Sequence, residues 1–413
     1  MKTLSARHAR RAVLAAILLL LPLVLQSLGH HWVRVADTSL LYVMLALGLN
    51  VVVGYAGLLD LGYVAFYALG AYLFALLTSP HLTDHFAWIA ALFPQGLHTP
   101  WWVTIPLGAA LAAILGMLLG APTLRLRGDY LAVVTLGFGE IVRLLVINLG
   151  HPVNITHGAQ GLGLIDPVRI LGVDLGQPLV VAGHEVASVT LYYYLFLTLV
   201  LITIVICQRL QDSRIGRAWM AIRDDETAAR SMGINTRNLK LLAFGVGASF
   251  GGITGAMFAA FQGFVSPEAF SLNESVLIVA MVVFGGMGHI PGVVLGAVLL
   301  AALPEMLRYV VGPLQAATNG QLDAGVVRPL LIALAMIVTM LCRSSGLWPT
   351  PDKAQAPGST GHSMGLADQT SAAPAPRNGL SRSDSPLWSI SCISASNCPS
   401  SPLGKPSRAN QFR

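Results

Sequence analysis

Long apolar stretches run through this chain, and they limit its possible folds more than any other feature. A helix needs roughly 20 predominantly apolar residues to cross a hydrocarbon core about 30 Å thick. The stretches are continuous rather than alternating, so they indicate membrane helices and not the strands of a barrel. We therefore predict an all-α integral membrane protein, a polytopic helical bundle of about 10 transmembrane segments. The predicted spans are residues 11–29, 38–57, 60–78, 101–121, 129–149, 189–207, 238–262, 274–287, 291–310 and 326–341.

The charges are few, and the basic ones are placed unevenly. Only 11% of the residues are charged, whereas a soluble globular chain carries about 25%. The net charge of +6 does not indicate a nucleic-acid-binding protein, because Lys and Arg gather between apolar stretches as the positive-inside rule describes. Counting spans from a cytoplasmic start predicts that both termini are cytoplasmic. The basic regions then lie on the cytoplasmic side: the N-terminus, Arg125 with Arg127, loop 209–240 and Arg343.

Three parts are expected along the chain. Residues 1–10 form a cytoplasmic N-terminus, and residues 11–348 form the transmembrane domain, with a cytoplasmic loop at 209–240. Residues 349–413 are rich in Ser, Pro, Ala and Gly, so they bury too little apolar surface to fold, and we predict a disordered tail. No cysteine pair has metal-binding CxxC spacing, and we expect free thiols at Cys207, Cys342, Cys392 and Cys398.

Two regions join apolar spans through dense glycines. Hydrophobic segments interrupted by Gly or Pro point to a substrate path in transporters, because broken backbone at membrane depth is tolerated only inside protein or beside a water-filled cavity. The alternative is that small residues merely let helices pack closely. By the span count both regions run in the same direction, so they do not by themselves show an inverted repeat. The candidates for a substrate path are Asn50, Gly54, Gly57, Gly285, Gly286 and Gly288.

Ionisable residues within the spans are further candidates. Glu140 and Arg143 lie three residues apart on one helix face and can pair. A charge inside the membrane marks a transport path by default, so both join the substrate-path candidates. Other charged residues lie in or beside apolar runs, and some of them also suit the membrane interface: Asp60, Glu274, Glu305 and Arg308.

The loop at 209–240 has a partial helical apolar face, formed by Ile215, Trp219, Ile222 and Met232. Its Glu226, Ala228-Ala229 and Gly233 are similar to the Glu-Ala-Ala-x3-Gly loop with which ABC importer permeases dock on an ATPase, although Thr227 shifts the register by one residue. The alternative is an ordinary solvated loop. The predicted coupling residues are Arg217, Ala218, Trp219, Arg223, Glu226, Ala228, Ala229 and Gly233.

Several stretches together resemble the LivM-type permeases of branched-chain amino-acid ABC importers. They occur in the family's order between residues 38 and 349, and include GLNVVVGYAG at 48–57, LRLRGDYLA at 124–132, TLGFGEIVR at 135–143 and GGMG at 285–288. The sequence departs from the family pattern at Asp60, where an uncharged residue is usual, and at His289, where Ser, Thr or Asn is usual.

This resemblance implies a transport subunit in a bacterial inner membrane. Its partners would be a second homologous permease, two cytoplasmic ABC ATPases and a periplasmic amino-acid-binding protein, with leucine, isoleucine and valine as substrates. Residues 218–233 would form the ATPase-coupling segment. The chain has no G-x4-GK[ST] phosphate loop, so the partner subunits would bind ATP, and we expect no cofactor, metal or catalytic residue here.

Two alternatives stay open on sequence. A permease for urea or another small polar solute in the same superfamily would share most of these motifs. A secondary transporter would work without ATP.

Overall fold

The computed structural model describes residues 17–27, 29–93, 97–123, 129–151, 154–170, 172–181 and 184–317, with residues 330, 333, 334 and 337 of a later segment. The predicted N-terminal segment 1–10 and the predicted tail 349–413 lie outside the described residues. So does most of the predicted span 326–341.

Long apolar helices build the described part of the chain. Five are long and apolar enough to cross a membrane: α2 (His30–Asn50) with its π-helical continuation η1 (Val51–Tyr55), α6 (Trp101–Thr123), α7 (Asp129–Asn148), α8 (Ser188–Asp212) and α11 (Thr236–Gln262). Shorter apolar helices are Ile17–Ser27, α3 (Val64–Thr78) and α12 (Leu272–Gly285), and α13 (Ile290–Ala317) contributes the shorter apolar stretch Ile290–Met306. In order, these helices match the predicted spans from 11–29 to 291–310. The all-α, polytopic architecture is confirmed.

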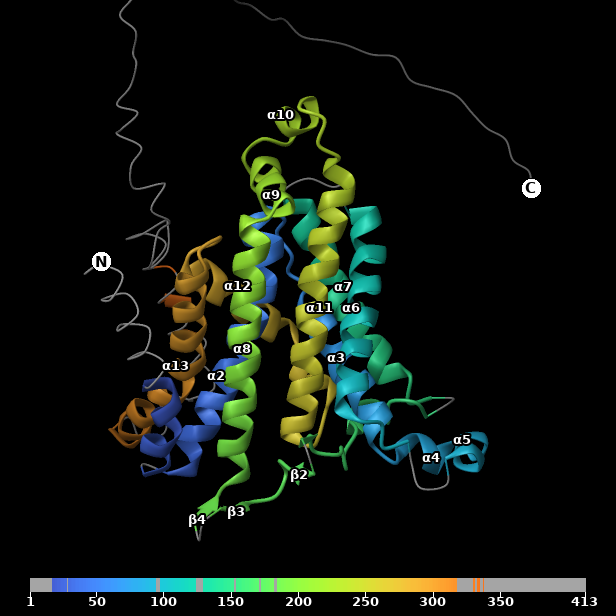
Figure 1. Ribbon diagram of the computed structural model, residues 1–413, viewed down its shortest axis with the longest axis vertical. Coiled ribbons are helices and arrows are strands. Elements are labelled where there is room, and N and C mark those ends of the chain that lie inside the picture. The colour runs from blue at the N-terminus through green and yellow to red at the C-terminus, as the bar shows by residue number, and fades with distance from the viewer. Residues whose placement is uncertain are drawn as a thin grey trace, which may run out of the picture. The chain divides into compact units, whose positions relative to one another are not determined.

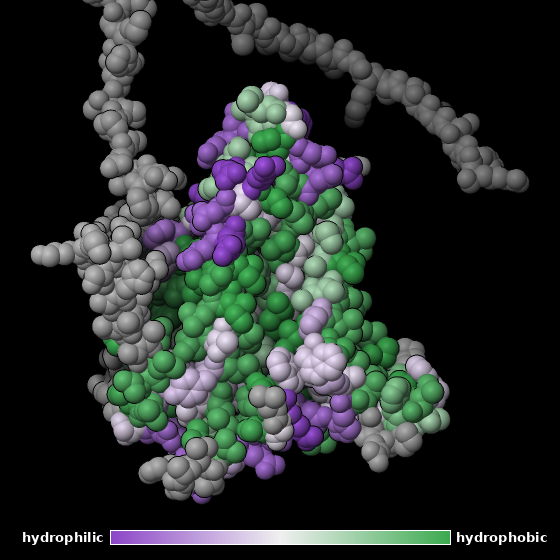
Figure 2. All heavy atoms as spheres, in the orientation of Figure 1, coloured by the Kyte–Doolittle hydropathy of each residue, from purple (hydrophilic) through white to green (hydrophobic). Residues whose placement is uncertain are grey.

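Helix α11 lies at the centre of the bundle and packs against α6, α3 and α2. Glycines allow this close approach: a Cβ added at Gly70 of α3 would lie 2.6 Å from the Cα of Gly252 in α11, and one added at Gly252 would lie 2.7 Å from the carbonyl oxygen of Gly108 in α6. The outward faces carry large apolar side chains such as Leu118 and Val133, which are mostly exposed. Figure 2 shows this apolar surface over the middle of the bundle, with hydrophilic residues gathered toward its two ends.

Small elements cap both ends of the bundle. One end carries α9 (Arg214–Asp224) and α10 (Glu226–Ser231), so the predicted loop 209–240 is largely helical (Figure 1). The other end carries α4 (His81–His85), α5 (Ala87–Leu92), η2 (Gly158–Gln160) and two antiparallel hairpins. The hairpins pair β1 (Arg169–Ile170) with β2 (Val173–Asp174), and β3 (Leu179–Val181) with β4 (His184–Val186).

Two interrupted segments enter the bundle from opposite ends. Residues 56–63 leave η1 on the α9 side and lead into α3. Residues 263–271, which include η3 (Pro267–Phe270), start from the opposite side, where Val265 pairs with Leu162, and lead into α12. Inside the bundle, the hydroxyl of Ser275 in α12, the helix that follows the second segment, donates a hydrogen bond to the Leu61 carbonyl of the first segment.

The segment that joins η1 to α3 therefore has an inverted counterpart at 263–285, which enters the bundle from the opposite end. This counterpart was not predicted from the sequence, where the first region was compared with the glycine-dense region at 285–292, which runs in the same direction.

Candidate coupling site and substrate path

Helix α9 is fixed to the bundle by its apolar face. Ser213 caps its N-terminus by accepting a hydrogen bond from the Gly216 amide at 3.1 Å. Trp219 is 0% exposed, and its indole Nε1 donates to the Leu239 carbonyl at the start of α11 at 2.7 Å. Ile222 is also buried, which confirms the predicted apolar face for these two residues. Ile215 and Met232 were also assigned to that face, but they are 37% and 83% exposed.

Helix α10 forms an exposed tip beyond α9. Asp225 caps it by accepting hydrogen bonds from the Thr227 and Ala228 amides at 2.7 and 3.0 Å. Gly233 ends it with φ +83°, and a Cβ added there would meet nothing within 4 Å. The tip thus combines a fixed backbone with open space around it, which suits docking by a partner.

An ion-pair network ties α10 to α11. The Glu226 carboxylate lies 2.7 Å from Nζ of Lys240 and 3.0 Å from Nη2 of Arg230. The hydrogen bond from Lys240, followed by the charges of both cations, holds the pKa of Glu226 below its usual range. Glu226 therefore stabilises α10 and holds it to α11 through these two ion pairs.

The other predicted coupling residues differ in exposure. Arg217 is exposed and donates to the Asp212 carbonyl at 2.7 Å, Ala218 is half-buried, Ala228 is exposed and Ala229 is buried.

Arg223 of α9 reaches both glycine joints. Its Nη1 donates a hydrogen bond to the carbonyl oxygen of Gly54, within the π-helical turn η1. The same Nη1 lies 3.0 Å from the Cβ position of Gly288. Its Cγ lies 2.8 Å from the Cβ position of Gly57. A single side chain of the coupling segment thus touches the backbone of α2–η1 and of the α12–α13 turn.

The two joints also hold each other. The Gly288 amide donates to Oδ1 of Asn50 at 2.8 Å. At Gly54 a Cβ would collide with that same Oδ1 and would lie 2.7 Å from the Gly288 nitrogen. Gly57 and Gly288 have φ of +69° and +86°, which glycine adopts without the strain that a side chain brings. Asn50, Gly54, Gly57 and Gly288 therefore meet Arg223 at one place, which sequence spacing could not show.

The remaining path candidates lie elsewhere. A Cβ added at Gly285 would lie 2.7 Å from the carbonyl carbon of Gly292, so close packing of α12 on α13 accounts for Gly285. Gly286 ends α12 with φ +110°. Glu140 and Arg143 pair on α7, as predicted, with Nε of Arg143 at 3.0 and 3.1 Å from the two carboxylate oxygens.

Comparisons with known proteins identify the family. Residues 32–341 match the family described as the permease component of branched-chain amino acid transport systems. The chain belongs to this family. It is a membrane transport subunit and not an enzyme.

Relatives of the permease carry consistent descriptions. It is 40% identical over 329 residues to the high-affinity branched-chain amino acid transport system permease protein LivM of Escherichia coli strain K12, covering 77% of this chain and 70% of that protein. It is 27% identical over 274 residues to LivH of the same strain, covering 63% of this chain and 79% of LivH. A probable LivM of Methanocaldococcus jannaschii is 24% identical over 248 residues, covering 59% of this chain and 68% of that protein. No solved structure matches the permease.

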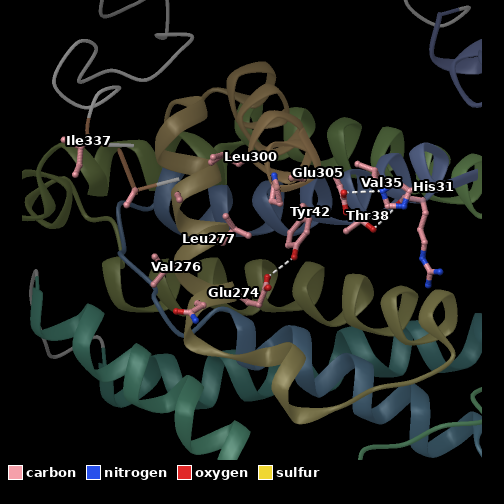
Figure 3. A pocket seen from close by; sticks show the side chains of 16 residues that line it. His31, Val35, Thr38, Tyr42, Glu274, Val276, Leu277, Leu300, Glu305 and Ile337 are labelled. Carbon is pink, nitrogen blue, oxygen red and sulfur yellow. Dashed lines mark hydrogen bonds and ion pairs between the residues drawn. The ribbon is translucent and has the colours of Figure 1, made fainter. Parts of the chain in front are cut away.

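A large cavity of about 930 Å³ lies between α2, α12 and α13 of the permease (Figure 3). Two polar contacts line it: the Tyr42 hydroxyl donates to Oε2 of Glu274 at 2.8 Å, and Nε2 of His31 lies 3.3 Å from Oε2 of Glu305. The rest is largely aliphatic, including Leu277 and Leu300. Glu274 thus lies in a cavity wall at the start of a short helix, which its sequence position beside a span did not reveal.

Sequence reasoning missed a histidine cluster in the permease. His81 and His85 of α4 have ring centroids 4.3 Å apart, and His157 lies 5.2 Å from His81. The spacing of four between His81 and His85 was the available signal, since it places both on one helix face. Among the described residues no group of His, Cys, Asp and Glu forms a metal-ligand set.

Proposed function

We propose that this permease translocates branched-chain amino acids as one of two homologous permeases in an ATP-driven importer. Two cytoplasmic ATPases and a periplasmic amino-acid-binding protein complete the proposed assembly. The names and coverage of the LivM and LivH relatives support the substrate class and the permease pair. The exposed α10 tip supports an ATPase partner.

The contact of Arg223 with both joints is the observation that carries the mechanism. In an alternating-access cycle, ATP-driven closure of the partner ATPases moves α9 and α10. Arg223 passes this displacement to the Gly54 carbonyl and to the turn at Gly288. Glycines at both joints let the backbone rotate without collisions between side chains. A partner drives such a change only through different affinity for the two conformations.

The proposed orientation places α9 and α10 in the cytoplasm and the β-hairpins in the periplasm. The basic residues of 209–240 support this assignment. Both termini would then lie on the cytoplasmic side of a bacterial inner membrane.

The substrate path is proposed to run past the large cavity toward the joints. The cavity offers aliphatic walls for a branched side chain and carboxylates for an ammonium group. Glu140 and Arg143 stay candidates for a second wall of the path.

The test is ATP-dependent uptake of labelled leucine by proteoliposomes that hold the permease with its partners. Arg223→Ala removes the link to both joints, and we expect uptake to fall about tenfold or more while the complex still hydrolyses ATP. Arg223→Lys keeps the charge but has a shorter reach to the two joints, so we expect partial uptake. Gly233→Asp, which strains the end of α10, is expected to uncouple in the same way.

Arg214→Ala is the matched control, because Arg214 is exposed at the start of the same helix and is not among the predicted coupling residues. It should leave uptake near the wild-type rate. Equal losses in the Arg214 and Arg223 variants would reject the link. Uptake of urea without leucine would overturn the substrate class, and leucine uptake without ATP would overturn the importer.

A further inference from the structure

A second, smaller cavity of about 240 Å³ lies between α3, α6, α7 and α11. Sites for drug-sized ligands measure about 300–1,000 Å³, so this one suits a smaller molecule. Its wall is almost entirely apolar. The aliphatic members include Leu119, Val134 and Ile141, and the aromatic members are Phe66, Phe138 and Phe244.

One carboxylate belongs to this apolar wall. Asp60 is 1% exposed, and its Oδ1 accepts a hydrogen bond from the Gly62 amide at 2.9 Å. Its Oδ2 has no hydrogen-bond partner among the described residues, and the Thr135 hydroxyl is the side-chain donor that lies nearest to the carboxylate. No lysine or arginine occurs in the described lining of the cavity. A buried, ionised carboxylate with an unused oxygen is unfavourable until a cation or donor reaches it.

The two hydroxyls of the cavity are already engaged. Thr135 Oγ1 accepts from the Leu61 amide at 3.0 Å and donates to the Ala132 carbonyl at 3.1 Å. Thr123 Oγ1 donates to the Leu119 carbonyl at 3.1 Å. The described wall therefore offers an acceptor to a ligand but no spare donor, which favours a cation and disfavours an anion.

We propose that this cavity binds the alkylammonium end of a small aliphatic solute. The ammonium donates a charge-assisted hydrogen bond to Oδ2 of Asp60. The rings of Phe66 and Phe138, with centroids 6.2 Å apart, present π-faces that attract a cation. The alkyl chain contacts the aliphatic wall.

A zwitterionic amino acid is a poor fit to this cavity. Its carboxylate lies one carbon from its ammonium, so it would be buried beside Asp60 without a cation. The site is therefore distinct from the proposed leucine path. It adjoins segment 56–63, which leads from the joint at Gly54 to α3.

The test measures binding of 3-methylbutylammonium to the permease in its assembled complex, in lipid nanodiscs, by isothermal titration calorimetry. We expect binding to the wild type and about tenfold or greater weakening in Asp60→Asn. Asparagine keeps the oxygen that the Gly62 amide needs, so this variant removes the charge and not the turn. The anion 4-methylpentanoate, which has a similar aliphatic chain, should not bind.

Two further variants keep the result decisive. Phe138→Leu removes a ring while Asp60 stays in place, and should weaken binding about threefold even if Asp60→Asn fails to assemble. Asp84→Asn neutralises an exposed carboxylate of α4, outside both cavities, and should leave the affinity unchanged. No binding to the wild type, equal binding to Asp60→Asn, or an equal loss in Asp84→Asn would overturn the site. Leucine uptake is measured separately, so failure of the transport proposal would leave this binding result intact.

Discussion

At the scale of single residues, Gly54 is a position where the permease tolerates little change. A Cβ there would collide with Oδ1 of Asn50, which accepts the hydrogen bond from the Gly288 amide. Gly54→Ala should therefore break the contact between the two joints. Overpacking of this kind costs about 1–3 kcal/mol. We expect a lower unfolding temperature and loss of ATP-dependent uptake, measured on the assembled complex.

Gly137→Ala in α7 is the matched control for Gly54→Ala. A Cβ at Gly137 meets nothing within 4 Å, and alanine favours a helix over glycine by about 1 kcal/mol. This variant should keep or slightly raise the unfolding temperature. Equal damage from both substitutions would show that the joint is not specially crowded.

At the scale of elements, α4 is held against residues 154–161 by histidines. Nε2 of His81 contacts the Asn154 carbonyl at 3.2 Å, and His85 and His157 lie beside its ring. Burial, and then the charge of His85, lower the pKa of His81 from its ordinary 6.5. Because the folded state binds this proton less readily than the unfolded state, the contact is fully stable above about pH 6.5 and weakens as the pH falls through the lowered pKa.

Amide hydrogen exchange of residues 154–161 measures this effect. After correction for intrinsic rates, we expect faster exchange at mildly acidic pH than at neutral pH in the wild type. His81→Gln keeps a donor for the Asn154 carbonyl and removes the titration, so its pH dependence should be smaller. His151→Gln, at an exposed histidine outside the cluster, should behave as the wild type. An unchanged pH dependence in His81→Gln would assign the effect to another group.

The elements also show what the sequence could predict. The spans were predictable because hydropathy and helix length are local properties, and the joints at Gly54 and Gly288 because glycine density is local too. The link from Arg223 to Gly54 crosses 169 residues and depends on how α9 folds back on η1. The inverted pairing of 56–63 with 263–271 stayed hidden because the second segment is interrupted by Gly263 and Pro267 outside the glycine-dense motif. The sequence position of Asp60 also suits the membrane interface. Its burial among α3, α6, α7 and α11 depends on how these four helices pack, which the sequence does not show.

At the scale of the whole molecule, the charge pair on α7 predicts which face meets the second permease. Glu140 lies roughly 17 Å along this helix from Asp129, near the middle of a membrane span. The side chains of Arg143 and Glu140 are 26% and 40% exposed. Charges facing lipid at that depth cost about 2.5–3.5 kcal/mol each or more. This face of α7 is therefore expected to be covered by the partner permease or to border the path between the two.

A photo-crosslinker locates that face. We expect p-benzoylphenylalanine in place of Ile141, which is 61% exposed beside the Glu140–Arg143 pair, to cross-link the partner permease in the assembled complex. The same crosslinker in place of Ile202 on α8 is the control, because Ile202 is 49% exposed among apolar neighbours that suit lipid. Cross-links to protein from position 202 and none from position 141 would assign the interface to α8. The α7 ion pair would then need another source of polar surroundings, because lipid alone does not stabilise it.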